Sequence, residues 1–153
     1  MQVPYHKQNR DYTCGPACLR MVLEYYDSYQ DEISITKLCG TTIAGTSLSE
    51  IANAADGFGL QATWKTSATL KDLKSAIKQA RPVIAMVDAR ILHGLEIPIP
   101  AGHMIVIFAI EKNKIRFHDP QLGHDQQVSI SNFSASWQNM RNGMVMIWQK
   151  SNP

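Results

Sequence analysis

Residues 11–26 read DYTCGPACLRMVLEYY, and this stretch decides the fold. From residue 14 onward, only four residues interrupt the apolar series, namely Gly15, Pro16, Arg20 and Glu24. A helix that is apolar over most of its circumference is buried at the centre of a domain rather than lying on its surface. The stretch therefore predicts a central core helix over residues 14–26.

Cys14 stands at the start of that helix. Thr13 is a candidate N-cap, and Pro16 fits the first turn, where its missing N–H is no loss. The positive end of the peptide dipoles favours a thiolate over a thiol, and the thiolate is the nucleophilic form. Cys14 is therefore the candidate nucleophile.

The composition suits a single domain over residues 1–153. The chain is 44% hydrophobic and 18% charged, with a net charge of +2. No cluster of Lys and Arg is present to neutralise a run of phosphates, so no nucleic-acid partner is expected. The longest apolar runs, such as residues 104–110, are too short to span a bilayer, so no membrane segment is expected.

Three cysteines, Cys14, Cys18 and Cys39, are too few and odd in number for a disulfide framework. We interpret them as thiols in a reducing setting, with Cys18 and Cys39 as buried small hydrophobes, Cys39 in a loop. No secretory signal is visible after Met1, which favours a cytoplasmic location. A metal site built from the cysteines and a histidine is a weaker alternative, because no second Cys/His pair has ligand spacing. No metal or organic cofactor is implied.

The order of the elements predicts an α+β domain. Helices are expected at residues 34–38, after Ser47 with its capping box, after Thr69, and at 133–137. Strands are expected at residues 60–64, 83–87, 103–110, 115–118, 127–130 and 144–148. We therefore expect an N-terminal helical half packed on a C-terminal antiparallel sheet.

A cysteine nucleophile needs a base and a group that orients the base. His103 begins one apolar strand and Asp119 ends the next, each on the face of the apolar residues. A three-residue loop over 111–113, with Asn113 left-handed, places Asp119 opposite Ile105 and diagonal to His103, with Cα atoms ~7–8 Å apart. A two-residue loop over 112–113 would instead place Asp119 on the wrong face.

The remaining polar candidates are Gln8 and four histidines. The Gln8 amide, six residues before Cys14, is a candidate second oxyanion donor beside the backbone N–H of Cys14. Taken alone, a Gln in a polar segment indicates a solvated loop residue. Solvent-exposed positions in loops or on outward strand faces are expected for the other histidines, which are His6, His93, His118 and His124.

These motifs together resemble one family. VPY at residues 3–5, Gln8, CGPACL at 14–19, Gly-His at 102–103 and HDP at 118–120, with Gly123 following, are similar to the bacteriocin-processing (double-glycine leader) peptidases and their stand-alone relatives. The resemblance covers nearly the whole chain, about residues 3–148. It implies a papain-like cysteine peptidase fold with Cys14 as nucleophile, His103 as base, Asp119 as its orienting group and Gln8 as oxyanion donor.

The resemblance implies cleavage of a peptide or protein substrate through an acyl-enzyme at Cys14. Two alternatives stay open, since acyl transfer shares the acyl-enzyme step and a module of the same fold could bind a peptide without cutting it. A fused or partner transporter also stays open, although this chain shows no nucleotide-binding motif. Thr13 departs from the family's frequent acidic residue, and residues 88–101 could shape a substrate cleft of their own.

Overall fold

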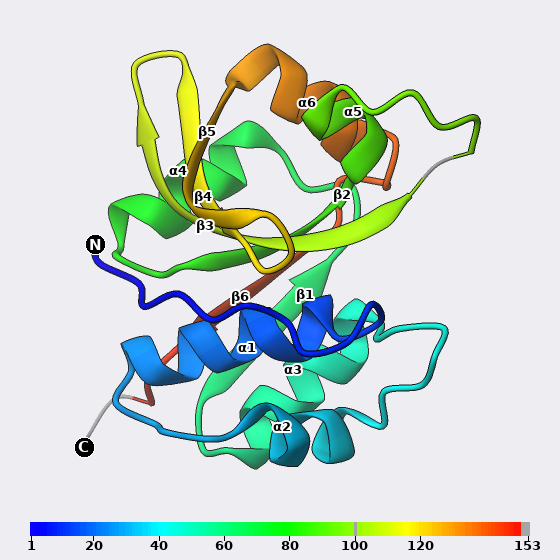
Figure 1. Ribbon diagram of the computed structural model, residues 1–153. Helices are drawn as coiled ribbons and strands as arrows, with labels where there is room; N and C mark the ends of the chain where they lie inside the picture. The colour runs from blue at the N-terminus through cyan, green and yellow to red at the C-terminus, as the bar shows by residue number, and fades with distance from the viewer. Residues whose placement is uncertain (100, 151–153) are drawn as a thin grey trace.

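A six-stranded antiparallel sheet is the centre of the computed structural model, which describes residues 1–99 and 101–150 (Figure 1). Its strands are β1 (Gln61–Lys65), β2 (Val83–Asp88), β3 (Gly102–Glu111), β4 (Lys114–Asp119), β5 (Gly123–Ser129) and β6 (Met144–Trp148). They lie in the order β1-β6-β2-β3-β4-β5, and each neighbouring pair is antiparallel. The predicted α+β class is confirmed.

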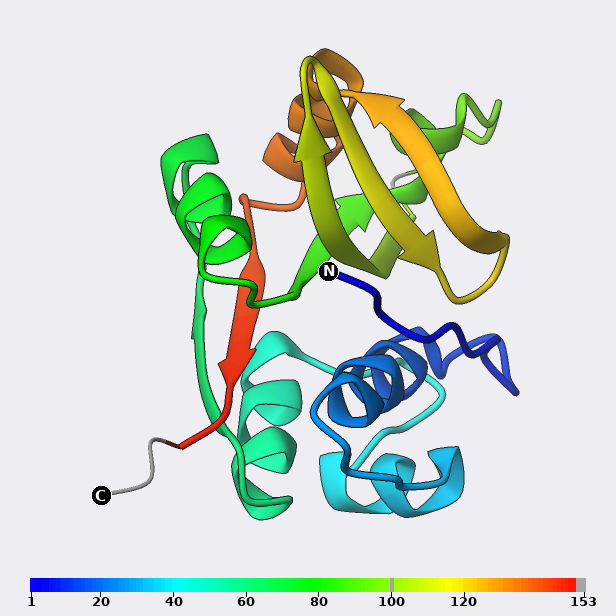
Figure 2. The same cartoon turned by 90° about the vertical axis from the view of Figure 1, so that its left-hand side faces the viewer.

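The helices form two groups that lie on opposite sides of the sheet (Figures 1 and 2). The first group holds α1 (Cys14–Tyr25), α2 (Glu32–Cys39) and α3 (Leu48–Gly57). The second holds α4 (Leu70–Lys78), α5 (Ala89–His93) and α6 (Ile130–Gln138). Two hydrophobic cores result, one on each face of the sheet.

β3 contributes to both cores by alternation. Met104 and Val106 pack with α1–α3, whereas Ile105 and Ile107 pack with α4–α6. A strand that is buried on both faces has a continuous apolar sequence, and this explains the unbroken run that follows His103.

The predicted core helix is confirmed as α1, with one correction at its start. Eight of its residues are buried, from Gly15 to Leu23. Thr13 occupies the N-cap position, but its side chain makes no capping hydrogen bond. Its buried hydroxyl instead donates to the carbonyl of Arg10 and accepts from the Arg10 N–H, both at 3.0 Å. Thr13 therefore closes the turn that leads into α1.

The loop between β3 and β4 differs from the expected one, yet Asp119 reaches the expected place. The turn has two residues, Lys112 and Asn113, and Lys112 rather than Asn113 has the positive φ of 54°. A β-bulge at Phe108 then shifts the register by one residue, so that Val106 lies opposite His118. Continued by one step, this register sets Ile105 opposite Asp119. The extra residue of the bulge replaces the extra loop residue that we expected.

Other helix and strand boundaries also differ from the predicted ones. The short helix predicted at 34–38 is longer, because Asp31 caps it by accepting from the N–H of Ser34. Cys39 is its last residue rather than part of a loop, although it is buried as expected. β5 begins at Gly123 rather than at residue 127, and α5 was not predicted.

Candidate active site

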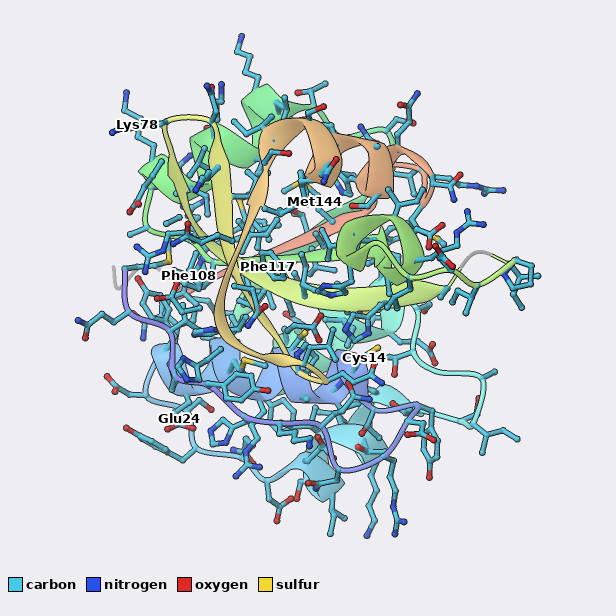
Figure 3. The ribbon with its side chains drawn as sticks, turned by 45° about the horizontal axis from the view of Figure 1, so that its top comes forward. Cys14, Glu24, Lys78, Phe108, Phe117 and Met144 are labelled. Atoms are coloured by element: carbon cyan, nitrogen blue, oxygen red, sulfur yellow. The ribbon has the colours of Figure 1, made fainter. Side chains whose placement is uncertain are left out.

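Cys14 is the first residue of α1 and lies beside the beginning of β3 (Figure 3). Its side chain is partly exposed, whereas Cys18, one turn further along, is fully buried. A cavity of about 210 Å³ adjoins the thiol, between the loop that precedes α1, residues 43–45 and Gly102. Of the three cysteines, Cys14 is therefore the one that a substrate can reach.

His103 connects Cys14 to Asp119, as the sequence predicted. Its Nε2 atom donates to Oδ1 of Asp119 at 2.8 Å, which leaves Nδ1 for the Cys14 thiol. His103 shares a strand face with Ile105 in the core of α4–α6, whereas Cys14 packs on the core of α1–α3. The two side chains meet because Cys14 begins α1, His103 stands near the beginning of β3, and both elements begin at the same end of the sheet.

The electrostatics favour a thiolate–imidazolium pair. Burial opposes charge on His103, but the Asp119 carboxylate and the Cys14 sulfur together raise the pKa of His103 to about 9. Burial also opposes the thiolate of Cys14, but hydrogen bonds from His103 and from the backbone of Met104 and Gly15 leave the Cys14 pKa lowered. A low cysteine pKa beside a high histidine pKa defines a range of pH in which both groups are charged.

Asp119 is fully buried and its carboxylate is saturated with donors. Oδ1 also accepts from the backbone N–H groups of Gln121 and Leu122 at 2.9 and 3.1 Å, and Oδ2 is bound by Nε2 of His93 at 2.7 Å. Burial alone would raise the pKa of Asp119, but the hydrogen bonds from His103 and His93 hold it well below its usual range.

His93 was expected to be a solvent-exposed loop residue, and this expectation is wrong. Its side chain is only 14% exposed because it ends α5 against Asp119 and Phe117. No periodicity marks His93 in the sequence. The only signal is its place in the segment 88–101, which leads into the strand that begins with the candidate base.

Gln8 lies in the extended N-terminal segment beside β4. Its backbone N–H donates to the carbonyl of Pro120 at 2.8 Å, and its side-chain Nε2 donates to the carbonyl of Arg10 at 2.8 Å. Oε1 of Gln8 is buried without a hydrogen-bond partner in the described part of the chain. The amide is thus partly buried and held near the N-terminus of α1, and its oxyanion role stays a prediction.

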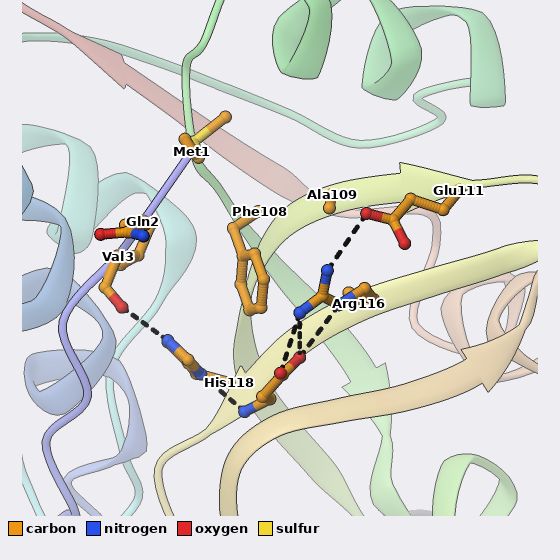
Figure 4. Close-up of a pocket in the computed structure, with 9 residues that line it drawn as sticks. Met1, Gln2, Val3, Phe108, Ala109, Glu111, Arg116 and His118 are labelled. Carbon is orange, nitrogen blue, oxygen red and sulfur yellow. Dashed lines mark hydrogen bonds and ion pairs between the residues drawn. The ribbon is translucent and has the colours of Figure 1, made fainter.

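His118 was also expected to face solvent, and it is instead buried. Its Nε2–H donates to the carbonyl of Val3 at 2.7 Å, and its Nδ1 accepts from the N–H of Asp125 at 2.9 Å (Figure 4). Burial lowers the pKa of His118, so this ring is the neutral tautomer. His124 is exposed as expected, and His6 pairs with Glu24.

Three consecutive residues of β4 and its turn hold the N-terminal segment. His118 binds Val3, the Tyr5 hydroxyl donates to the carbonyl of Asp119 at 3.0 Å, and the carbonyl of Pro120 accepts from Gln8. These contacts give a physical reason why the VPY motif, Gln8 and the HDP motif occur in one sequence.

Within residues 1–99 and 101–150, no group of three or more His, Cys, Asp or Glu side chains is arranged to hold a metal ion. Over the same residues, no helix combines the length and the apolar character needed to cross a membrane. Pro100, which the sequence places just before Ala101 and Gly102, lies outside the described residues.

Comparison with known proteins identifies the family of this chain. The model of the Peptidase C39 family matches residues 2–152, almost the whole chain. The chain belongs to the Peptidase C39 family. It is 34% identical over 118 residues to the lactococcin-A transport/processing ATP-binding protein LcnC of Lactococcus lactis subsp. lactis. That match covers 76% of this chain but only 15% of LcnC.

Solved C39 structures share the fold. The peptidase domain of Streptococcus ComA, a bifunctional ABC transporter, superposes with a TM-score of 0.80 at 20% identity, covering 97% of this chain and 100% of that domain. A double glycine motif protease from an AMS/PCAT transporter, solved with a leader peptide, gives a TM-score of 0.75 at 19% identity and covers 97% and 93%. The papain-like C39 fold is thereby confirmed for this chain.

The cysteine environments predict a selective reaction with iodoacetamide. Burial raises the pKa of Cys39 to about 12 and that of Cys18 well above its ordinary value, whereas that of Cys14 is lowered. Cys14 of this C39 family member should therefore alkylate first near neutral pH. Peptide mass mapping after brief labelling measures this, and earlier labelling of Cys18 or Cys39 would contradict the assignment of the nucleophile.

The raised pKa of His103 also predicts how stability depends on pH. Its folded value of about 9 exceeds the ordinary value of 6.5. Its contribution to the free energy of unfolding is therefore fully present below about pH 6.5 and is lost as the pH rises through about 9. Denaturant unfolding of the wild type and of His103→Gln should differ most below pH 6.5 and converge in alkali. A difference that stays constant with pH would show that the pKa of His103 is the same in the folded and the unfolded protein, and would contradict the charge pair.

Proposed function

We propose that this chain is a cysteine peptidase that cleaves leader peptides through an acyl-enzyme at Cys14. The observation that carries the proposal is the hydrogen bond of His103 to the buried Asp119, with the other ring nitrogen left for the Cys14 thiol. Membership of the C39 family supports the reaction class. The transport/processing role in the name of LcnC and the leader peptide bound to the AMS/PCAT protease support the substrate class.

The proposed reaction begins with the Cys14 thiolate. The sulfur attacks the carbonyl carbon of the scissile bond, and the backbone N–H of Cys14 and the Gln8 amide donate to the oxyanion. His103 then gives its proton to the leaving amine, and a thioester remains on Cys14. A water molecule, deprotonated by His103, attacks the thioester and releases the acid.

Asp119 is proposed to serve this cycle in two ways. Its Oδ1 fixes the orientation of the His103 ring, and its negative charge favours the imidazolium form that pairs with the thiolate. Acyl transfer to an amine in place of water needs the same groups, so the second nucleophile has to be identified by experiment.

A mass-spectrometric assay tests the reaction. The protein is incubated with peptides that carry a double-glycine leader, with and without an amine acceptor. We expect two hydrolysis fragments and no acceptor adduct from the wild type, and intact peptide with Cys14→Ala. Ala is tolerated near a helix start, so circular dichroism should show the variant folded. Acceptor adducts would indicate a transferase, and intact peptide with the wild type would contradict leader processing.

Two variants of Asp119 separate orientation from charge. Asp119→Asn keeps a side chain able to hydrogen-bond His103 but removes the negative charge, so we expect a lower cleavage rate with substantial residual activity. Asp119→Ala removes both, so we expect a larger loss. The rates of peptide cleavage measure the order. Full activity of both variants would reduce Asp119 to a residue that satisfies the turn after β4.

A further inference from the structure

Asp119 has a second side-chain partner that the catalytic arrangement described above does not use. One carboxylate oxygen, Oδ1, serves His103 and two backbone N–H groups. The other, Oδ2, is bound by Nε2 of His93 at 2.7 Å, in a setting where the Asp119 side chain has no exposure. An ionised oxygen buried in this way has a strong need for a donor, and His93 supplies it.

His93 lies in a connecting segment whose two ends are held together by hydrogen bonds. Residues 89–101 connect β2 to β3, and His93 ends the one helix, α5, that the described part of this segment contains. Asp88, whose side chain is fully buried, caps α5 by accepting from the N–H of Arg90 and also accepts from the N–H of Ala101. The Nδ2 atom of Asn139 on α6 donates to the same carboxylate at 2.6 Å.

The segment therefore has two anchoring carboxylates. Asp88 joins the beginning of the segment to its end at Ala101. Asp119 binds His93, the last residue of α5, and so holds α5 against the candidate active site. Gly94 follows with a φ of 65°, the left-handed conformation that ends α5 directly after His93. The helix thus stops where its last side chain reaches Asp119.

We propose that His93 is a positioning residue for the thiolate–imidazolium pair: its Nε2–H holds Oδ2 of Asp119 and so fixes Oδ1 toward His103. The proposal rests on the proposed role of Cys14 as the nucleophile. Without the Nε2–H donor, the carboxylate is held only through Oδ1, by His103 and the N–H groups of Gln121 and Leu122, and its hydrogen bond to His103 is lost for part of the time. The His103 imidazolium, and with it the Cys14 thiolate, then becomes less populated.

The titratable groups that face this carboxylate come from several elements. His103 on β3 and His93 on α5 contact it directly. Cys18 on α1 lies within electrostatic reach of it, Cys14 acts on its partner His103, and the Tyr5 hydroxyl donates to the backbone carbonyl of Asp119. Because His93 alone contacts Oδ2 among the described side chains, substitution of His93 addresses that oxygen without removing any group that contacts Cys14.

Alkylation of Cys14 by iodoacetamide tests the proposal without any peptide substrate. Rates are measured by mass mapping from about pH 5 to about pH 9 for the wild type, His93→Gln and His93→Phe. The amide of Gln can present an N–H where the Nε2 atom of His lies, whereas Phe keeps a ring against Phe117 but has no donor. His124→Phe serves as the matched control, because His124 is exposed and makes no hydrogen bond to Asp119.

Positioning through the donor predicts a specific pattern. His93→Phe should move the onset of Cys14 alkylation to higher pH and slow the reaction near neutral pH by about tenfold, the equivalent of one pKa unit. His93→Gln should stay within about twofold of the wild type, and the control should be unchanged. Thermal unfolding confirms that each variant is folded, and His93→Leu replaces His93→Phe if the latter does not fold.

The contrary outcomes are distinct. An unchanged onset in the folded His93→Phe variant would overturn the proposal, as would a His93→Gln variant as slow as His93→Phe. A shift to lower pH in both variants would mean that a positive charge on His93 opposes the His103 imidazolium, which also contradicts positioning. Preferential labelling of Cys18 or Cys39 in the wild type would overturn the proposed function itself. Normal alkylation without peptide cleavage would contradict only the substrate assignment.

Discussion

The buried carboxylate of Asp119 is the constraint on which the rest of the site depends. A charge without solvent contact is stable only when donors surround it. Its donors come from β3, from α5 and from the turn after β4. These segments must all be in place before the carboxylate can be buried. The pair of His103 and Asp119 therefore requires a completed sheet with α5 docked, and no single element can form it.

The two hydrophobic cores decide where Cys14 meets His103. Cys14 belongs to the layer of α1–α3, and His103 belongs to the sheet face that α4–α6 cover. Side chains on opposite faces of a sheet do not normally touch. Contact arises here because α1 begins where β3 begins, so both residues lie at the end of the sheet. This placement also leaves the thiol open to the cavity beside Gly102.

Sequence reasoning placed Cys14, His103 and Asp119 close together because their positions carry signals: a helix start, and the ends of two apolar strands. It missed His93, because the contact with Asp119 joins residues 26 apart through a segment without periodicity. It also missed the bulge at Phe108, since an extra residue in a strand and an extra residue in a loop give the same register beyond them. Alternation cannot distinguish these two where both faces of the strand are apolar.

His118 shows why strand position alone does not identify the candidate base. It adjoins Asp119 in the chain and is as buried as His103, at 6% exposure for each. The partners differ, however. His118 donates to one backbone carbonyl and accepts from one backbone N–H, an arrangement that only a neutral ring satisfies. His103 faces a carboxylate and a thiol, which favour the imidazolium. Burial is shared by both rings, so the charge of the neighbours decides which histidine carries the proton.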